Sequence, residues 1–114
     1  MRDEENEAIV VITTAGKAEE AQELARRLIE ARLAACVQIE EIRSLYRWEG
    51  RIEEAGEFRL QIKTLRSRYG AVEKLLRRHH PYETPEIIAL PIVALSEDYR
   101  AWLERETLTP PYPV

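Results

Sequence analysis

The chain has 114 residues, of which 45% are apolar and 33% charged, and it carries a formal net charge of −4 at pH 7. This length is typical of one domain with its own core, and the composition is that of a folded protein. The acidic balance argues against a general nucleic-acid partner, since such binders are usually basic. The apolar runs are far shorter than the roughly 20 residues that span a membrane, so no membrane partner is expected.

Two features predict the cellular location. Cys36 is the only cysteine, which excludes an internal disulfide and fits a reducing compartment. The first residues, 1–7, are almost all polar or acidic and do not resemble a secretory signal. We therefore expect a cytoplasmic protein whose residues 1–7 form a flexible leader.

The chain begins with a strand pattern followed by a helix pattern. Ala8 to Thr14 is β-branched and nearly all apolar, which predicts a buried central strand that ends at Ala15-Gly16. In residues 17–33, apolar side chains recur every three or four positions among charged and amide side chains. This spacing predicts an amphipathic helix.

Residues 36–48 and 51–64 are predicted to form a long hairpin that turns at Glu49-Gly50. In the second strand, Phe58, Leu60 and Ile62 share one face. The first strand changes phase, because Val37 and Ile39 occupy odd positions, whereas Ile42, Tyr46 and Trp48 occupy even ones. This change predicts a bulge or bend near Glu40-Glu41.

The hairpin is long for a domain of this size. An arm of about thirteen residues at ~3.3 Å each spans roughly 40 Å. A body with a radius of gyration near ~13–14 Å is only about 35 Å across. Tyr46, Trp48 and Ile52 near the tip are therefore predicted to overhang the core and to form an oligomer interface with closed symmetry. Alternatively, a bulge bends the hairpin back onto its own sheet.

The rest of the chain completes the fold. Helical spacing covers residues 67–79, and a buried strand is predicted for 86–94, at an edge or a bulge because it contains Pro91. Ser96 is a good cap for a last helix that ends near Glu106. The order β-α-β-β-α-β-α predicts the α+β class, a ferredoxin-like sandwich with an added C-terminal helix. The single domain spans 8–106, followed by a flexible segment at 107–114, whose Pro-rich part at 109–113 is extended and could dock a partner.

Four blocks carry a family resemblance, and they occur in the same order as in the family: Leu33 to Val37, Ser44 to Gly50, Ile62 to Thr64, and His80 to Pro91. Over roughly residues 8–106 the chain resembles the CutA divalent-cation tolerance family. The resemblance implies a ferredoxin-like fold and a tight homotrimer similar in build to the PII signalling proteins. It also implies a role linked to copper and other divalent cations, without established enzymatic activity.

His79 and His80 are the candidate metal ligands, because imidazole binds both Cu²⁺ and Zn²⁺. Neighbours on a helix point about 100° apart, so two adjacent rings do not readily hold one ion. Pro81 forces His80 out of the helix, and one histidine from each of three subunits could also meet at a cleft. The alternative is structural: a histidine at a helix end, favoured by the helix dipole.

Two positions depart from the family pattern. In the family that this chain resembles, members with a described copper site have a cysteine near the end of the first strand. The matching position in this chain is Thr13, whose hydroxyl is a poor ligand for soft metals. Leu95 stands where glycine is common, which affects only the local turn. The first departure bears on copper binding.

Further candidate cleft residues are Cys36, Lys63, Tyr82, Glu83 and Glu86. All except Tyr82 have a simpler alternative. The thiol is expected to be a buried structural group, and the lysine could lie on a solvated strand face. The two carboxylates could form an acidic rim for cations, pair with Arg59 or Lys63, or cap the rigid turn.

The leading prediction is a non-enzymatic, homotrimeric divalent-cation protein. The alternative is a PII-like regulatory module that binds a small metabolite at subunit clefts, where an apolar pocket with a few polar anchors would be expected. An RNA-binding module of the same strand order would need a basic surface. A scaffold for partner proteins also stays open, and no catalytic residue set or phosphate-binding loop is present.

Overall fold

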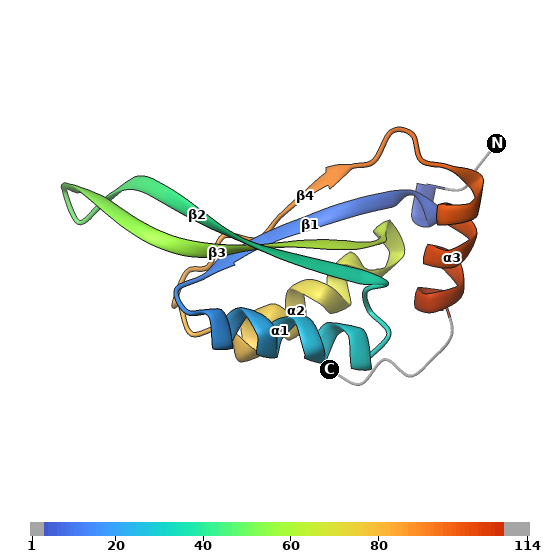
Figure 1. Ribbon diagram of the computed structural model, residues 1–114, viewed down its shortest axis with the longest axis horizontal. Coiled ribbons are helices and arrows are strands. Elements are labelled where there is room, and N and C mark those ends of the chain that lie inside the picture. Colours follow the sequence, from blue (N-terminus) through green and yellow to red (C-terminus); the bar gives the residue numbers. More distant parts are fainter. Residues whose placement is uncertain (1–3, 109–114) are drawn as a thin grey trace.

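The computed structural model describes residues 4–108 and contains a four-stranded antiparallel sheet with the order β2-β3-β1-β4 (Figure 1). Its strands are β1 (Ala8–Ala15), β2 (Cys36–Trp48), β3 (Arg51–Leu65) and β4 (Ile88–Pro91). The helices α1 (Ala18–Glu30) and α2 (Tyr69–His79) lie on one face of the sheet, and α3 (Glu97–Leu108) lies at one end. This is the predicted ferredoxin-like arrangement with an added helix. The predicted flexible segment at 107–114 is wrong at its start, because residues 107–108 belong to α3 and Thr107 is buried; the rest, with the tail predicted at 109–113, lies outside the described residues.

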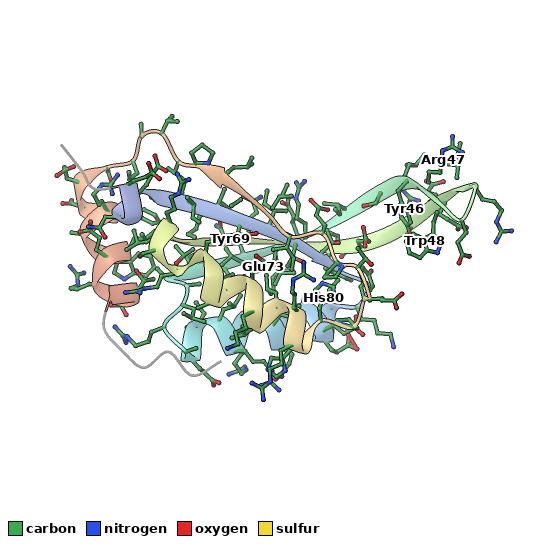
Figure 2. All side chains as sticks on the ribbon, turned by 180° about the vertical axis from the view of Figure 1, so that it is seen from behind. Tyr46, Arg47, Trp48, Tyr69, Glu73 and His80 are labelled. Carbon is green, nitrogen blue, oxygen red and sulfur yellow. The ribbon has the colours of Figure 1, made fainter. Side chains whose placement is uncertain are left out.

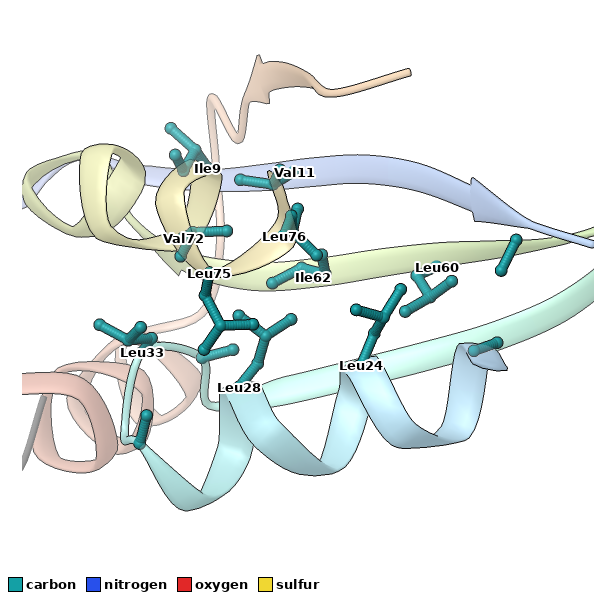
Figure 3. Packing of buried hydrophobic residues seen from close by; sticks show 14 residues of the cluster. Ile9, Val11, Leu24, Leu28, Leu33, Leu60, Ile62, Val72, Leu75 and Leu76 are labelled. Carbon is teal, nitrogen blue, oxygen red and sulfur yellow. The ribbon is translucent and has the colours of Figure 1, made fainter. Parts of the chain in front are cut away.

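The core lies between the sheet and its two covering helices. Leu24 and Leu28 of α1 point toward Leu60 and Ile62 of β3, and Val72 of α2 closes the same layer (Figure 3). All five side chains are almost completely buried. The alternation predicted for β3 and the helical stripe predicted for residues 17–33 are thereby confirmed.

The first helix is shorter than predicted. It ends at Glu30, with Ala31 as its C-cap, and Arg32 then takes the left-handed conformation with φ 60°. A left-handed residue cannot continue a right-handed helix. The apolar residue Leu33, which seemed to extend the helical stripe, instead reaches the core from the following turn.

The predicted bulge near Glu40-Glu41 is wrong. Strands β2 and β3 pair without interruption from Cys36 opposite Lys63 to Trp48 opposite Arg51. Because the backbone makes no adjustment, the outer part of the hairpin carries apolar side chains on both faces of the sheet. Val37, Ile39 and Leu45 lie on the helix side of the sheet, whereas Ile42, Tyr46 and Trp48 lie on the opposite face, here called the open face.

The outer hairpin, residues 42–57, extends beyond the helices (Figure 1). The molecule measures 47 × 28 × 20 Å, with the hairpin along the long axis. Leu45, Trp48 and Ile52 expose 66%, 52% and 70% of their surface. The predicted overhang is confirmed, and the hairpin does not fold back onto its own sheet.

Strand β4 is the shortest strand and pairs only with β1, from Ile9 opposite Pro91 to Ile12 opposite Ile88. The predicted strand at 86–94 is thus reduced to four residues, at the edge position that a proline favours. The prediction that this strand is buried is wrong, because all four of its residues are exposed. At the following helix, the N–H of Tyr99 donates to the Ser96 hydroxyl at 3.2 Å, as the predicted cap requires.

The predicted flexible leader is partly ordered. Residues Glu4–Asn6 form a 3-10 turn, and the N–H of Arg66 donates to the Glu7 carbonyl at 2.8 Å. The guanidinium of Arg66 also pairs with the carboxylates of Glu4 and Glu7, at 3.6 and 3.1 Å. These contacts fix residues 4–7 against the end of β3.

Candidate functional site

A groove of about 900 Å³ lies between the open face of the outer hairpin and the segment Tyr82–Glu86. Strands β2 and β3 form its floor, and the segment forms its wall. The lining side chains come from Ile42, Arg43, Ser44, Leu45, Tyr46, Trp48, Glu57, Arg59, Tyr82, Glu83, Thr84 and Glu86, with Thr14 at the end of β1. Figure 2 shows His80 beside the base of the hairpin and Tyr46 and Trp48 on its outer part.

The wall starts where α2 ends. The backbone of His80 is extended, with φ −76° and ψ 136°, and its N–H donates to the carbonyl of Leu76 at 2.8 Å. Pro81 imposes this extended geometry on the preceding residue, as predicted. The chain therefore leaves the helix at a fixed angle toward the end of β1.

Both ring nitrogens of His80 have partners. Nε2 lies 2.7 Å from the carbonyl oxygen of Thr14 and 3.2 Å from the hydroxyl of Thr13. Nδ1 accepts the backbone N–H of Tyr82 at 3.1 Å. Because Nδ1 accepts, the proton of the neutral ring is on Nε2, which donates to the Thr14 carbonyl.

Burial lowers the pKa of His80, and it outweighs three opposing influences: the Thr14 carbonyl and the carboxylates of Glu20 and Glu57. The neutral ring is therefore the favoured state near pH 7. A neutral imidazole fits the donor and acceptor pattern that these neighbours require.

Tyr82 makes the second anchor of the wall. Its hydroxyl donates to the Glu57 carboxylate at 2.9 Å, and burial together with this carboxylate raises its pKa to about 12. The hydroxyl also lies close to Gly16, where an added Cβ would come within 3.1 Å of it. Because Gly16 has no side chain, the Tyr82 hydroxyl can come this close to the backbone after β1.

The groove is negatively charged. The two arginines that line it are compensated, since Arg59 pairs with Glu40 and Arg43 with Glu54, each at 3.0 Å. Glu83 and Glu86 make no ion pair within residues 4–108. The alternative in which these two carboxylates pair with Arg59 or Lys63 is therefore wrong.

The predicted metal-ligand pair is divided by the structure. His80 faces the end of β1, whereas the charges nearest to His79 are Arg27, Arg78 and Glu23, so His79 lies toward α1. Burial, followed by the two arginines, lowers the pKa of His79. Within residues 4–108, no three histidine, cysteine or acidic side chains are grouped so that they could hold a metal ion. The paired-histidine site stays a prediction.

The predicted cleft residues fall into two groups. Tyr82, Glu83 and Glu86 lie together in the groove. Cys36 and Lys63 are cross-strand partners at the opposite end of the hairpin, outside the groove. The thiol is only half-buried and contacts the ring hydroxyl of Tyr99, and the lysine donates to Gln38.

Two groove residues, Glu57 and Thr14, were not predicted. Glu57 lies 25 positions before its partner Tyr82, and Thr14 lies 66 positions before His80. The period of two along β3 does place Glu57 on the same face as Arg59, which is the only signal that the sequence offers.

The sheet order and helix placement define an α+β protein of the ferredoxin-like type, and similarity to known proteins defines its family. Residues 9–106 match the family model described as CutA1 divalent ion tolerance protein. A "Divalent-cation tolerance protein CutA" from Pectobacterium atrosepticum is 43% identical over 98 residues, 85% of this chain and 89% of the relative. This chain therefore belongs to the CutA1 family, which is not a known enzyme family.

Solved structures agree with this assignment. The structure of CutA from Synechococcus elongatus PCC7942 has a TM-score of 0.87 at 38% identity and covers 92% of this chain and 94% of its own. The structure of the "Periplasmic divalent cation tolerance protein CutA" from Archaeoglobus fulgidus has a TM-score of 0.86 at 37% identity. The match covers 88% of this chain and 98% of that protein's chain. Across residues 4–108, none of the helices has the length and apolar character needed to cross a membrane.

Proposed function

We propose that this protein acts in divalent-cation tolerance as a non-enzymatic homotrimer that binds cations in the groove beside the outer hairpin. Cation binding in the groove is supported by two carboxylates on its wall, Glu83 and Glu86, which have no ion-pair partner among the described residues. Family membership supports the cation role.

Two separate apolar surfaces support the homotrimer. The first is the outer hairpin, where Trp48 and Ile52 are exposed without a covering helix. The second is the open face of β1 and β4, where Leu90 and Ile88 expose 48% and 45% of their surface beside Val10 and Ile12. Exposed apolar surfaces of this kind mark interaction sites.

The difference between the two surfaces favours a ring. A two-fold dimer would join one surface to itself, whereas contact between two different surfaces is head-to-tail and forms a ring when the rotation between copies closes. We propose that the outer hairpin of one copy covers the open face of the next, with three copies in the ring. Each groove would then lie at a subunit boundary.

The carboxylate rim is the proposed cation contact. Carboxylate oxygens bind hard and borderline divalent cations, whereas Cu²⁺ and Zn²⁺ also favour imidazole. The paired-histidine alternative would require His80 to release Tyr82, if the metal binds Nδ1, or Thr14, if it binds Nε2. His79 and His80 are therefore the second set of possible ligands, and copper is the ion with which to test them.

The test is a calorimetric titration of the metal-free protein with Cu²⁺ and Zn²⁺ at pH 7.5. Glu83→Gln/Glu86→Gln should weaken binding by at least about tenfold, because two charged ligands are lost. The matched control is Glu19→Gln/Glu30→Gln, which removes the same charge from exposed positions of α1. Binding that is lost only in His79→Ala would move the site to the histidines, and no binding to wild type would contradict the cation role.

A small-metabolite role in the same groove is the second candidate. Its volume of about 900 Å³ is within the usual range for ligand sites, and Tyr46, Trp48 and Tyr82 give it aromatic walls. Native mass spectrometry of protein purified from its host would reveal a retained small molecule. A mass equal to that of the bare assembly, together with metal binding, would favour the cation role.

The predicted cytoplasmic location is part of the proposal, supported by the single Cys36. The relative from Archaeoglobus fulgidus is named periplasmic, so location is worth testing directly. Cell fractionation followed by detection of the protein would decide between the two compartments.

A further inference from the structure

We propose that His80 is a positioning residue that joins the end of β1 to the Tyr82–Glu86 segment and so sets the shape of the groove. This inference depends on the geometry around the ring and does not require a bound cation. It therefore goes beyond the proposed function and can hold or fail separately from it.

The first observation concerns the edge of the sheet. Strand β1 pairs with β4 only as far as Ile12, so Thr14 lies beyond the last partner on that edge. A carbonyl left without a partner at such a place costs free energy when it is removed from water. The imidazole of His80 supplies the missing donor at 2.7 Å, in the position that a further residue of β4 would otherwise occupy.

The second observation concerns the other side of the ring. The backbone N–H of Tyr82 points back to Nδ1 of His80 at 3.1 Å. A neutral imidazole offers a donor and an acceptor on opposite sides of one rigid plane. The ring therefore links two backbone segments that are 66 and two positions away from it in the sequence.

The third observation shows what the link achieves. With its N–H fixed by His80, Tyr82 packs against the imidazole with the ring planes tilted by 52° and the centroids 5.0 Å apart, and its hydroxyl donates to Glu57 of β3. The segment is thus attached to β1 through the histidine and to β3 through the tyrosine. Glu83 and Glu86, which follow these anchors, are held as the wall opposite the outer hairpin.

This role conflicts with metal ligation by the same ring in this conformation. A metal ion needs a free lone pair on imidazole, and the only one, on Nδ1, accepts the Tyr82 N–H. Thr13, whose hydroxyl is 3.2 Å from Nε2, adds a second oxygen on the donor side. The structure thus assigns the ring to the wall of the groove.

Nuclear magnetic resonance of the wild-type protein at pH 7.5 tests the proposal. Long-range ¹H–¹⁵N correlations should show His80 as the neutral tautomer with its proton on Nε2. A ring protonated on Nδ1, or on both nitrogens, would overturn the proposal. This readout needs no variant and no metal.

Two substitutions then separate the two sides of the ring. His80→Asn keeps an acceptor near the position of Nδ1, whereas His80→Gln keeps only a group near Nε2. Loss of the acceptor should speed exchange of the Tyr82 amide hydrogen by roughly five- to tenfold, the worth of one hydrogen bond. We expect this in His80→Gln, with His80→Asn close to wild type.

His79→Gln is the matched control, because it makes the same change one position earlier, on a ring that faces α1. Exchange at Tyr82 should be unchanged in this variant. Equal acceleration in all three variants would mean that the region merely loosens, and no acceleration in His80→Gln would mean that the bond to Tyr82 is unimportant. Either result would contradict the positioning role.

Discussion

The inner and outer halves of the β2–β3 hairpin share one continuous register but differ in where their apolar side chains lie. In the inner half, Leu60 and Ile62 point toward the helices and are completely buried. In the outer half, Tyr46 and Trp48 lie on the open face and are about half exposed. Leu45 and Ile52 lie on the helix side of the sheet but beyond the helices, so the outer half exposes apolar side chains on both of its faces. Exposed apolar surface of this extent is typical of an interaction site.

The largest expected effect separates two leucines in this hairpin. Leu60→Ala should lower the free energy of unfolding by about 2–5 kcal/mol at any protein concentration, because it leaves a cavity in the core. Leu45→Ala removes a side chain that is 66% exposed and should have little effect on the folded chain itself. Denaturant unfolding followed by circular dichroism measures both. Equal losses would contradict the division into two halves.

The next effect concerns assembly. Trp48→Ser/Ile52→Ser removes the two large apolar side chains near the hairpin tip and should dissociate the oligomer while the fold is retained. A central aromatic residue typically contributes about 2 kcal/mol or more to an interface, which is roughly thirtyfold in affinity. Sedimentation velocity over a range of concentrations measures the change. Unaltered assembly would show that the outer hairpin is not the interface.

Much of the fold could be predicted because its signals are local. The period of two in β3 and the stripe in α1 identified Leu60, Ile62 and Leu24 as core residues. The bulge near Glu40-Glu41 was a wrong interpretation of a correct observation. A change of phase was taken as a backbone defect, whereas the backbone is regular and the outer half carries apolar side chains on both faces.

A smaller effect is expected at the turn of the hairpin. Gly50 has φ +79°, and Glu49 before it has φ 49°, the left-handed pair that a tight hairpin turn requires. Gly50→Ala should cost about 1 kcal/mol because a side chain disfavours this conformation. Gly56→Ala, at a non-positive φ with nothing near an added Cβ, is the control. Thermal unfolding compares them.

The smallest effect is a pH dependence of stability. Burial lowers the pKa of His80, against the pull of Glu20 and Glu57, so the unfolded chain takes up a proton first as the pH falls below about 6.5. The contribution of neutral His80 to the free energy of unfolding is therefore complete above that pH. It is lost as the pH falls toward the pKa of His80 in the folded protein. His80→Gln should flatten the decline between pH 7 and 5, as followed by urea unfolding. A steeper decline in the variant would contradict this sign.

The site was less predictable than the fold. The sequence identified Tyr82, Glu83 and Glu86 through one unusual segment, but it could not show that His80 bonds to a backbone carbonyl 66 residues away. It also grouped Cys36 and Lys63 with that segment, although they pair at the other end of the hairpin. Such groupings depend on register and on chain direction in space, which residue types alone do not specify.

The central claim is that a second copy of the chain covers the outer hairpin, in a ring of three. Light scattering during size-exclusion chromatography measures the mass of the wild-type protein directly. The account predicts three times the chain mass of 13.3 kDa, stable on dilution to low micromolar concentration. A single-chain mass at all concentrations would contradict it and would leave the exposed hairpin without the partner proposed for it.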